Sequence, residues 1–426
     1  MQNKNNNKYY NNNNRYNNNK YNNNNRYNNN NNRYNNNNKY NNKIDFDPDN
    51  LKLKNFHEYK ITVKTLTPIF IGSGEELNKT MYVYDNKTNK VSIIHKERLY
   101  SFLESKELFE KFSEDCMKEN FSISDFFNGI DYDDSIFKYS LEYRDNNIIN
   151  NNKDSLNSIN TFVKSCDVPY IPGSSIKGAI RTAIIANAII ENKDKLKFYM
   201  KDKSIRQMSN LEDEIIKKYI LKDKFNKNKL FNSIHVSDSN PIPIYCDEKN
   251  ETSNFFIGSR YDYSLKSKDI NAMSIQLEFL KPDTIFTFNL SIDRLLSNVF
   301  DIKYIIDSLN KYFNIYKKTI DLFPNALSIT KNQYHAYRNS ENANIFIGGH
   351  NGYFTKNIIY SIAKFHGDKE GIEIKDIVEK IKRHIRKDEE DCYEEICPRT
   401  LRFTKYDDIF YDIGICSIEK IEEIKI

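Results

Sequence analysis

The chain has 426 residues, and 64 lysines and arginines against 59 aspartates and glutamates give it a net charge of +5. This length is sufficient for one large domain or two moderate ones with a buried core. No apolar run approaches the roughly 18 residues that a membrane-spanning helix needs, and the first residues lack the apolar segment of a secretion signal, so we expect a cytoplasmic protein.

Residues 1–43 differ from the rest in composition. Asparagine runs are interrupted by pairs of a basic residue and a tyrosine, from Lys8-Tyr9 to Lys39-Tyr40, and no aliphatic residue lies between Met1 and Ile44. This composition predicts a disordered tail. Its eight cations and interleaved aromatic rings suit RNA binding without sequence preference, although compositional drift in an AT-rich genome would produce the same pattern.

The rest of the chain is not basic. Residues 44–426 carry 56 cations against 59 acids, a net charge of −3, so a nucleic-acid site in this part must be a local patch. Its cysteines form no Cys-x-x-Cys pair, which argues against a structural zinc site. We expect free buried thiols, no metal and no other cofactor.

The first elements in chain order are a strand and two helical regions. Alternation over residues 59–66 predicts the strand, and residues 96–129 contain an apolar pattern typical of helices. Pro172-Gly173 predicts a turn before a helix over residues 175–191, with Ser174 or Ser175 as the N-cap. Its core-facing residues would be Ile176, Ile180, Ala183, Ile184, Asn187 and Ala188. Residues 192–233 indicate a charged helical insertion.

The second half of the chain predicts a similar set of elements. Residues 274–280 and 284–292 flank Lys281-Pro282-Asp283 and predict a hairpin, followed by a helix over 301–323 and a strand over 343–347. The order is strand, helix, strand, strand, helix, strand. We therefore expect an α+β fold with a ferredoxin-like core, as in RNA-recognition modules, with large helical insertions and a C-terminal α/β extension.

This order also suggests domain boundaries. We expect a tail at 1–43, a core at 44–347 with insertions at about 67–170 and 192–233, and a glycine-rich loop with a C-terminal extension at 348–426.

The start of the predicted helix at 175–191 is suited to phosphate. Lys177 and Arg181 stand four residues apart near an N-terminus that offers backbone N–H groups and the positive end of the helix dipole. The alternative is a capped core helix with two solvated cations.

Four segments resemble one known family. The segment from Pro172 to Arg181 resembles the central motif of the RAMP superfamily, the RNA-binding subunits of CRISPR effector complexes. Residues 66–74 are similar to the family's first strand and glycine turn, and residues 345–356 to its glycine-rich loop. Residues 398–404 with 414–416 are similar to the tail of one Csm subunit of type III-A systems. The resemblance covers nearly all of the chain beyond residue 43.

The resemblance implies an RNA-binding subunit of a type III-A CRISPR-Cas (Csm) interference complex in antiviral defence. Such a subunit would contact the 3′ part of the CRISPR RNA and support its maturation by a separate nuclease. Its expected partners are CRISPR RNA and other Csm subunits, namely the backbone RAMP subunit and the small subunit. The expected RNA-binding residues are Gly72, Ser73, Gly74, Ser174, Ser175, Lys177, Arg181, Gly348, Gly349, His350, Gly352 and Lys356.

Two alternatives differ in chemistry. His350 could act as a general acid or base, which would make the chain a metal-independent RAMP endoribonuclease that cleaves CRISPR RNA itself. The aspartate with which a related subunit slices target RNA is replaced here by Glu75 and Glu76, which could still hold Mg²⁺. The second alternative is a protein-only scaffold that caps the filament through its insertions. Without an obvious catalytic partner for His350, we expect a non-catalytic protein.

Overall fold

The computed structural model describes residues 56–144, 158–202, 208–222, 227–247, 252–264, 269–294, 301–322, 334–335, 344–385, 397–398 and 400–424. The chain divides into two units, Met1–Asp47 and Pro48–Ile426, and the second contains every described residue. The predicted tail at 1–43 therefore lies outside the described residues.

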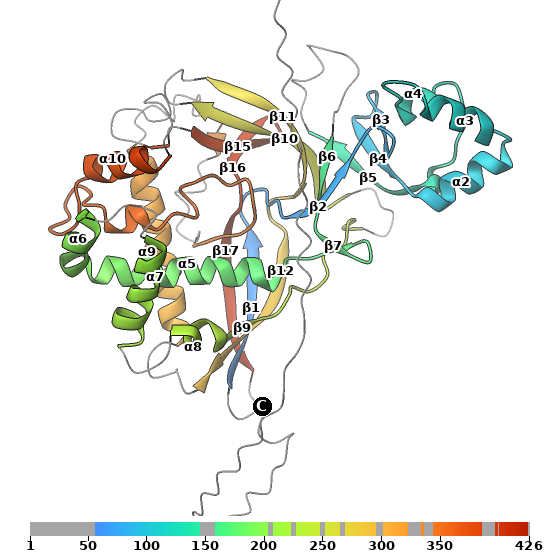
Figure 1. The fold of residues 1–426 in the computed structure, drawn as a ribbon. Coiled ribbons are helices and arrows are strands. Elements are labelled where there is room, and N and C mark those ends of the chain that lie inside the picture. Colours follow the sequence, from blue (N-terminus) through green and yellow to red (C-terminus); the bar gives the residue numbers. More distant parts are fainter. Residues whose placement is uncertain are drawn as a thin grey trace, which may run out of the picture. The chain divides into compact units, whose positions relative to one another are not determined.

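The first sheet has five antiparallel strands and carries two long helices. Its order is β14 (Ile345–Phe346), β17 (Ile415–Ile424), β1 (Phe56–Thr65), β12 (Ile285–Asp293) and β9 (Ile234–Val236). Helix α5 (Gly173–Glu191) lies between β1 and β9 in the chain, and α9 (Ile302–Asp321) lies between β12 and β14. Figure 1 shows α5 running across the strands. The predicted α+β class is confirmed.

Helices α5 and α9 pack together through the apolar stripes that the sequence predicts. All six predicted core-facing residues of α5 are at most 2% exposed. The one polar member, Asn187, donates from Nδ2 to Ser308 Oγ of α9 at 3.0 Å. Helix α9 begins where the Asp301 side chain accepts the Tyr304 N–H at 2.9 Å, a typical N-cap.

The predicted hairpin of residues 274–280 and 284–292 is wrong. These residues form strands, but β11 (Ile270–Leu280) belongs to the second sheet, and β12 pairs with β1 and β9. At the intervening turn, the Asp283 N–H donates to Thr65 O at 2.7 Å, which directs the chain into the first sheet beside β1. In chain order, the second strand of the first sheet is the short β9, and the last strand is β17.

The second sheet has ten strands. Its main path runs β13 (Tyr334–His335), β16 (Ile409–Asp412), β15 (Thr400–Tyr406), β10 (Phe255–Ser264), β11, β6 (Ile159–Phe162) and β2 (Gly72–Leu77). A branch adds β5 (Phe137–Tyr143), which pairs with β10, and then β4 (Lys90–Ile94) and β3 (Tyr82–Asp85). A separate small sheet pairs β7 (Lys164–Ser165) with β8 (Val168–Pro169).

Two helical segments extend from this framework, within the ranges where insertions are predicted. The first contains α2 (Lys96–Ser105), α3 (Phe109–Cys116), α4 (Ile123–Phe126) and η1 (Asp134–Ile136), which pack on β3 around a separate small core. The second contains α6 (Lys193–Asp202), α7 (Met208–Ile215), the π-helical turn η3 (Ile216–Ile220) and α8 (Lys227–Asn232). The C-terminal region adds η7 (Ile359–Ile362) and α10 (Ile374–Ile385). Among the described helices, none is long and apolar enough to cross a membrane.

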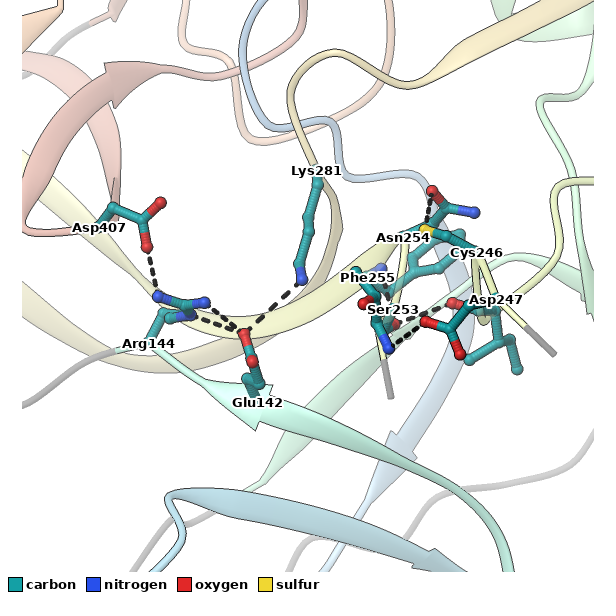
Figure 2. Close-up of polar contacts among 11 residues, drawn as sticks. Glu142, Arg144, Cys246, Asp247, Ser253, Asn254, Phe255, Lys281 and Asp407 are labelled. Atoms are coloured by element: carbon teal, nitrogen blue, oxygen red, sulfur yellow. Dashed lines mark hydrogen bonds and ion pairs between the residues drawn. The ribbon is translucent and has the colours of Figure 1, made fainter. Parts of the chain in front are cut away.

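The expectation of free buried thiols is wrong for several cysteines. Cys116, Cys166 and Cys246 are free but exposed, and Cys246 Sγ donates to Asn254 Oδ1 at 2.9 Å (Figure 2). Cys416 is free and buried, and burial raises the pKa of its thiol. Cys397 is disulfide-bonded. Cys116 is the last residue of α3, and Cys166 lies in the turn between β7 and β8.

Candidate nucleic-acid interface

Three segments that are far apart in sequence meet at one junction between the two sheets. They are residues 66–72 after β1, the glycine-rich loop after β14, and the turn before β17. The Gly349 N–H donates to Phe70 O at 2.7 Å, the Gly414 N–H to Pro68 O at 2.8 Å, and the Ile347 N–H to Gly414 O at 2.8 Å. The structure thus brings together segments from three of the four motifs that carry the family resemblance.

Gly348 allows this close approach. Its φ is +99°, and a Cβ at this position would lie 2.4 Å from Phe70 O. Any other residue at this position would be strained, both by the left-handed backbone conformation and by the contact of its Cβ with Phe70 O. The next residues turn sharply, with His350 at φ +56°, and the His350 ring packs edge-on against the Phe70 ring at 5.2 Å between centroids.

A group of cations surrounds His350. Strand β10 supplies Arg260 and Asp262, strand β15 supplies Arg402 directly opposite Asp262 in the antiparallel register, and the glycine-rich loop supplies Lys356. Arg260 is 8% exposed, and its Nη1 donates to His350 Nδ1 at 3.3 Å. Its Nε lies 3.0 Å from Asp262 Oδ1. We call Arg260, Arg402 and Lys356 the cationic cluster.

The cationic cluster has more positive charge than its surroundings neutralise. Burial and the charges of Arg260, Arg402 and Lys356 lower the pKa of His350 to about 4, so its imidazole is neutral at pH 7. Partial burial and Arg402 lower the pKa of Lys356. Burial and Arg260 likewise lower the pKa of Arg402, whereas the carboxylate of Asp262 opposes both shifts at His350 and Arg402. Such mutual repulsion favours a bound anion.

Other cations beside the second sheet are paired with carboxylates. Figure 2 shows Arg144 between Glu142 and Asp407, with Lys281 beside the same Glu142. The Arg144 Nε donates to Glu142 Oε2 at 2.8 Å, and Lys281 Nζ lies 3.6 Å from that oxygen. Within the described residues, Arg402 and Lys356 make no comparable ion pair. The cationic cluster is therefore the better candidate for a phosphate ligand.

The start of α5 differs from its predicted form. The helix begins at Gly173, Pro172 is the N-cap, and neither Ser174 nor Ser175 caps it. Instead, Asp238 Oδ1 accepts the Gly173 N–H at 2.7 Å. A Cβ at Gly173 would lie 2.4 Å from Val236 O, so glycine lets the segment after β9 approach closely enough to supply this carboxylate.

The two predicted cations of α5 have different surroundings. Arg181 Nη2 donates to Glu212 Oε2 of α7 at 2.7 Å, and its guanidinium lies over the Phe231 ring. Arg181 is thus already paired with the second insertion. Lys177 is half-buried and makes no ion pair with a described residue.

A pocket of about 290 Å³ joins the start of α5 to the glycine-rich loop. Helix α5 contributes Ser174, Ser175 and Gly178 to it, and the loop contributes Gly348, Asn351 and Lys356. Four predicted site residues, Ser174, Ser175, Gly348 and Lys356, therefore line one pocket. Lys356 also belongs to the cationic cluster, so the pocket and the cluster share one residue.

The first glycine turn lies apart from this pocket. Gly72, Ser73 and Gly74 are exposed at the start of β2, where Ser73 Oγ lies 2.6 Å from Thr161 Oγ1. Glu75 and Glu76 follow in the same exposed strand. Within the described part of the chain, no group of three or more His, Cys, Asp or Glu side chains could hold a metal ion.

The environment of His350 bears on catalysis. Its Nδ1 accepts from Arg260, so the proton of the neutral ring lies on Nε2. With a pKa of about 4, this imidazole has little protonated form at pH 7 to serve as an acid and is a weak base. The contact with Arg260 and the lowered pKa disfavour His350 as a general acid.

Sequence reasoning missed Arg260, Asp262 and Asn351 as residues of the site. Arg260 and Asp262 lie within a strand, where a local pattern cannot distinguish a site residue from a surface residue. Arg402 belongs to a segment that resembles the family, but its sequence does not show that it faces the glycine-rich loop; the pairing of β15 with β10 does.

Comparison with known proteins agrees with these motifs. The RAMP superfamily model matches residues 62–350. The chain is 27% identical over 256 residues to the Csm5 protein of Streptococcus thermophilus, which covers 56% of this chain and 65% of that protein. It is 27% identical over 250 residues to Csm5 of Methanocaldococcus jannaschii, covering 56% and 54%. The matches thus span less than two thirds of these relatives' length.

Two solved structures share the fold. A chain of a cryo-EM structure of a Csm–crRNA–target RNA ternary complex superposes with a TM-score of 0.57 at 16% identity, covering 85% of this chain and all of that one. The crystal structure of T. onnurineus Csm5 gives 0.54 at 16% identity, covering 84% and 100%. The resemblance to Csm5 proteins is confirmed, and the chain belongs to the RAMP superfamily.

Proposed function

We propose that this chain is a non-catalytic, RNA-binding subunit of a type III-A CRISPR-Csm complex. The observation that carries the proposal is the cationic cluster. Arg260, Arg402 and Lys356 meet at the junction of the two sheets with Asp262 as the nearby carboxylate, and the pKa values of Lys356 and Arg402 are lowered there. A sugar-phosphate backbone would supply the missing negative charge.

The fold and the relatives support this function. The first sheet has the order β17, β1, β12, β9, with a helix after β1 and another after β12, which we interpret as a ferredoxin-like core. The relatives are named as Csm5 proteins, and one structural neighbour comes from a complex that contains crRNA and target RNA. In this chain we infer contact with the 3′ part of CRISPR RNA, and support for its maturation by a separate nuclease.

The first helical insertion is suited to contacts with neighbouring Csm subunits. It forms a small core of its own, yet Tyr100, Phe109 and Met117 remain 47%, 45% and 89% exposed. Helix α3 buries none of its own residues fully. We infer that the backbone RAMP subunit and the small subunit are the partners of this complex.

A salt titration of RNA binding tests the proposal. Arg402→Gln and Lys356→Gln in the full-length protein should each weaken binding to CRISPR RNA and reduce the slope of log affinity against log salt by about one unit. The matched control is Lys420→Gln, because Lys420 is an exposed cation that is paired with Glu422 at 2.8 Å on β17. The control should change neither quantity.

The proposal fails if the double variant Arg402→Gln/Lys356→Gln folds normally and keeps the wild-type slope. A second readout concerns maturation. In the assembled complex, the same variant should leave CRISPR RNA longer at its 3′ end, because the RNA would be held less firmly in front of the nuclease. An unchanged length distribution would contradict the role in maturation, but it would not contradict the proposal that the chain binds RNA.

A further inference from the structure

Arg260 of β10 is a buried cation whose contacts lie within the protein. It is 8% exposed. Its Nε lies 3.0 Å from Asp262 Oδ1, its Nη2 donates to Asp262 Oδ2 at 3.3 Å, and its Nη1 lies 3.3 Å from His350 Nδ1. All three guanidinium nitrogens thus face Asp262 or His350. These contacts and the burial indicate that Arg260 acts on its neighbours and not directly on a ligand.

The contact with Arg260 decides which nitrogen of His350 carries the proton. An arginine has only donors and stays charged at physiological pH, so the ring nitrogen that faces it, Nδ1, is the unprotonated one. The N–H group of the neutral ring is therefore at Nε2. Burial and the charges of the three cations lower the pKa of His350 to about 4, and this neutral form persists at pH 7.

The Nε2–H group of His350 is left for a ligand. It has no hydrogen-bond partner among the residues that the structure describes, and the side chain is only partly buried. Two contacts hold the ring in place, namely Arg260 at Nδ1 and the Phe70 ring, which packs edge-on at 5.2 Å between centroids. A donor whose direction is fixed in this way is preorganised for an acceptor from outside the chain.

The surroundings of His350 favour an anionic oxygen as that acceptor. Asp262, the carboxylate that pairs with Arg260, lies directly opposite Arg402 in the register of β10 and β15, so these side chains share one face of the sheet. Lys356 belongs to the same loop as His350 and is exposed. Within the described part of the chain, neither Arg402 nor Lys356 makes an ion pair. A phosphate oxygen satisfies the donor and both cations together.

We propose that His350 binds an RNA phosphate oxygen as a neutral donor through its Nε2–H group, and that Arg260 is the positioning residue that fixes this tautomer. The inference deepens the proposed function and rests on it, since Arg402 and Lys356 would hold the same stretch of backbone by charge. A neutral donor adds direction to this contact. It also keeps the affinity independent of pH in the range in which an ordinary histidine titrates.

Amide substitutions at position 350 test the donor. A glutamine places its amide near the position of Nε2, whereas an asparagine reaches only that of Nδ1. In the full-length protein, His350→Asn should weaken binding of CRISPR RNA roughly three- to tenfold, and His350→Gln at most about twofold. The loss should be the same with an oligonucleotide of abasic deoxyribose phosphates, which has neither bases nor 2′-hydroxyls. A loss confined to RNA would overturn the phosphate contact.

The salt dependence of binding tests whether the donor is neutral. Neither substitution should change the slope of log affinity against log salt at pH 6 or pH 8, because an uncharged group displaces no counterion. A slope that falls by about one unit in His350→Gln at pH 6 alone would show that the imidazole is protonated, and would overturn the assignment. Lys420→Gln is again the matched control.

The double variant Arg260→Met/Asp262→Asn tests the positioning role. It removes the ion pair as a whole, so the net charge of the site is unchanged and no unpaired carboxylate remains. Nitrogen-15 NMR of histidine-labelled protein reports the tautomer of His350, whose signals are those missing in His350→Gln. Wild type should carry the proton on Nε2, and the double variant should show a mixture of both tautomers. Arg260→Lys, which also offers only donors, should keep the wild-type tautomer.

Binding by the double variant completes the test. It should be weakened to a similar extent as in His350→Asn, and the addition of His350→Asn should cause little further loss, because both changes remove the same contact. Additive losses or an unchanged tautomer would contradict the role of Arg260. Far-UV circular dichroism and the melting temperature establish that each variant is folded.

Two outcomes separate this inference from the proposed function. If Arg402→Gln weakens RNA binding whereas His350→Asn does not, the neutral donor is wrong and the proposed function stands. If the wild-type protein binds no RNA, both are overturned.

Discussion

Three glycine-to-alanine substitutions separate the two constraints that act on Gly348. Gly348→Ala would place an L-residue at φ +99° and a Cβ 2.4 Å from Phe70 O. Gly352→Ala meets the first constraint alone, because its φ is +89° and a Cβ there has nothing within 4 Å. Gly178→Ala meets neither, because it lies within a helix with open space around it.

The expected changes in the free energy of unfolding follow from these contacts. A left-handed backbone costs an L-residue about 1–2 kcal/mol, and an extra carbon forced against packed backbone costs roughly 1–3 kcal/mol. Gly348→Ala should therefore destabilise the protein by about 2–5 kcal/mol, and Gly352→Ala by about 1–2 kcal/mol. Gly178→Ala should stabilise it by roughly 0.5–1 kcal/mol.

Urea-induced unfolding of the full-length protein, followed by far-UV circular dichroism, measures all three changes. Equal slopes of free energy against urea among the variants would show that the same unfolding transition is compared. The reasoning is refuted if Gly348→Ala costs no more than Gly352→Ala, since the contact with Phe70 O would then have no energetic effect. A destabilised Gly178→Ala would refute the assignment of open space at that position.

Further predictions concern His350 and the tail. Because the pKa of His350 falls from 6.5 unfolded to about 4 in the folded protein, the unfolded state binds more protons between these values, and stability is lost as the pH falls from 6.5 towards 4. His350→Gln should reduce this loss by roughly 2–3 kcal/mol, measured as urea midpoints at several pH values; an unchanged profile would contradict the shift. His350→Ala should keep CRISPR RNA maturation within a few-fold, whereas loss of a general acid or base costs on the order of 10²- to 10⁴-fold. Deleting residues 1–43 should weaken non-specific RNA binding at low salt but matter little near physiological salt, where the Debye length is about 8 Å; failure of the truncated chain to co-purify with Csm subunits would show that the tail has a role in assembly.

Local patterns predicted the long helices well. In α5 and α9 the apolar residues recur at helical spacing, and the same residues form the contact between the two helices, so local and tertiary preferences agree. The two helical insertions also have apolar patterns of their own in the sequence, between the predicted core elements. Strand β12 was predicted from its alternation, because one face is buried and the other is not.

Pairing was harder to predict than the elements themselves. Strand β11 ends with five buried residues in succession, so its sequence does not show which face meets the core or which strand is its partner. Two strands separated by a short turn favour a hairpin by default. Here the turn instead carries the chain from one sheet to the other, and only the contacts of Asp283 and Thr65 reveal this.

The site could be predicted in part. Glycine turns and the start of α5 have local signatures, and Ser174, Ser175, Gly348 and Lys356 do line one pocket. The cap of α5 comes from Asp238, which is 65 residues away in sequence, and Arg260 reaches His350 across 90 residues. Contacts over such separations depend on strand register, which no local pattern in this chain specifies.

The position of the cationic cluster has a thermodynamic consequence for the junction of the two sheets. Lys356 follows a strand of the first sheet, whereas Arg260 and Arg402 belong to the second, so like charges repel across the boundary. An anion bound between them would stabilise the folded arrangement that brings the cations together, by about 2.7 kcal/mol at a concentration a hundred times its dissociation constant. Under the proposed function, the RNA phosphates would be that anion, and a partner subunit that stabilises the same arrangement would strengthen RNA binding without contacting the RNA.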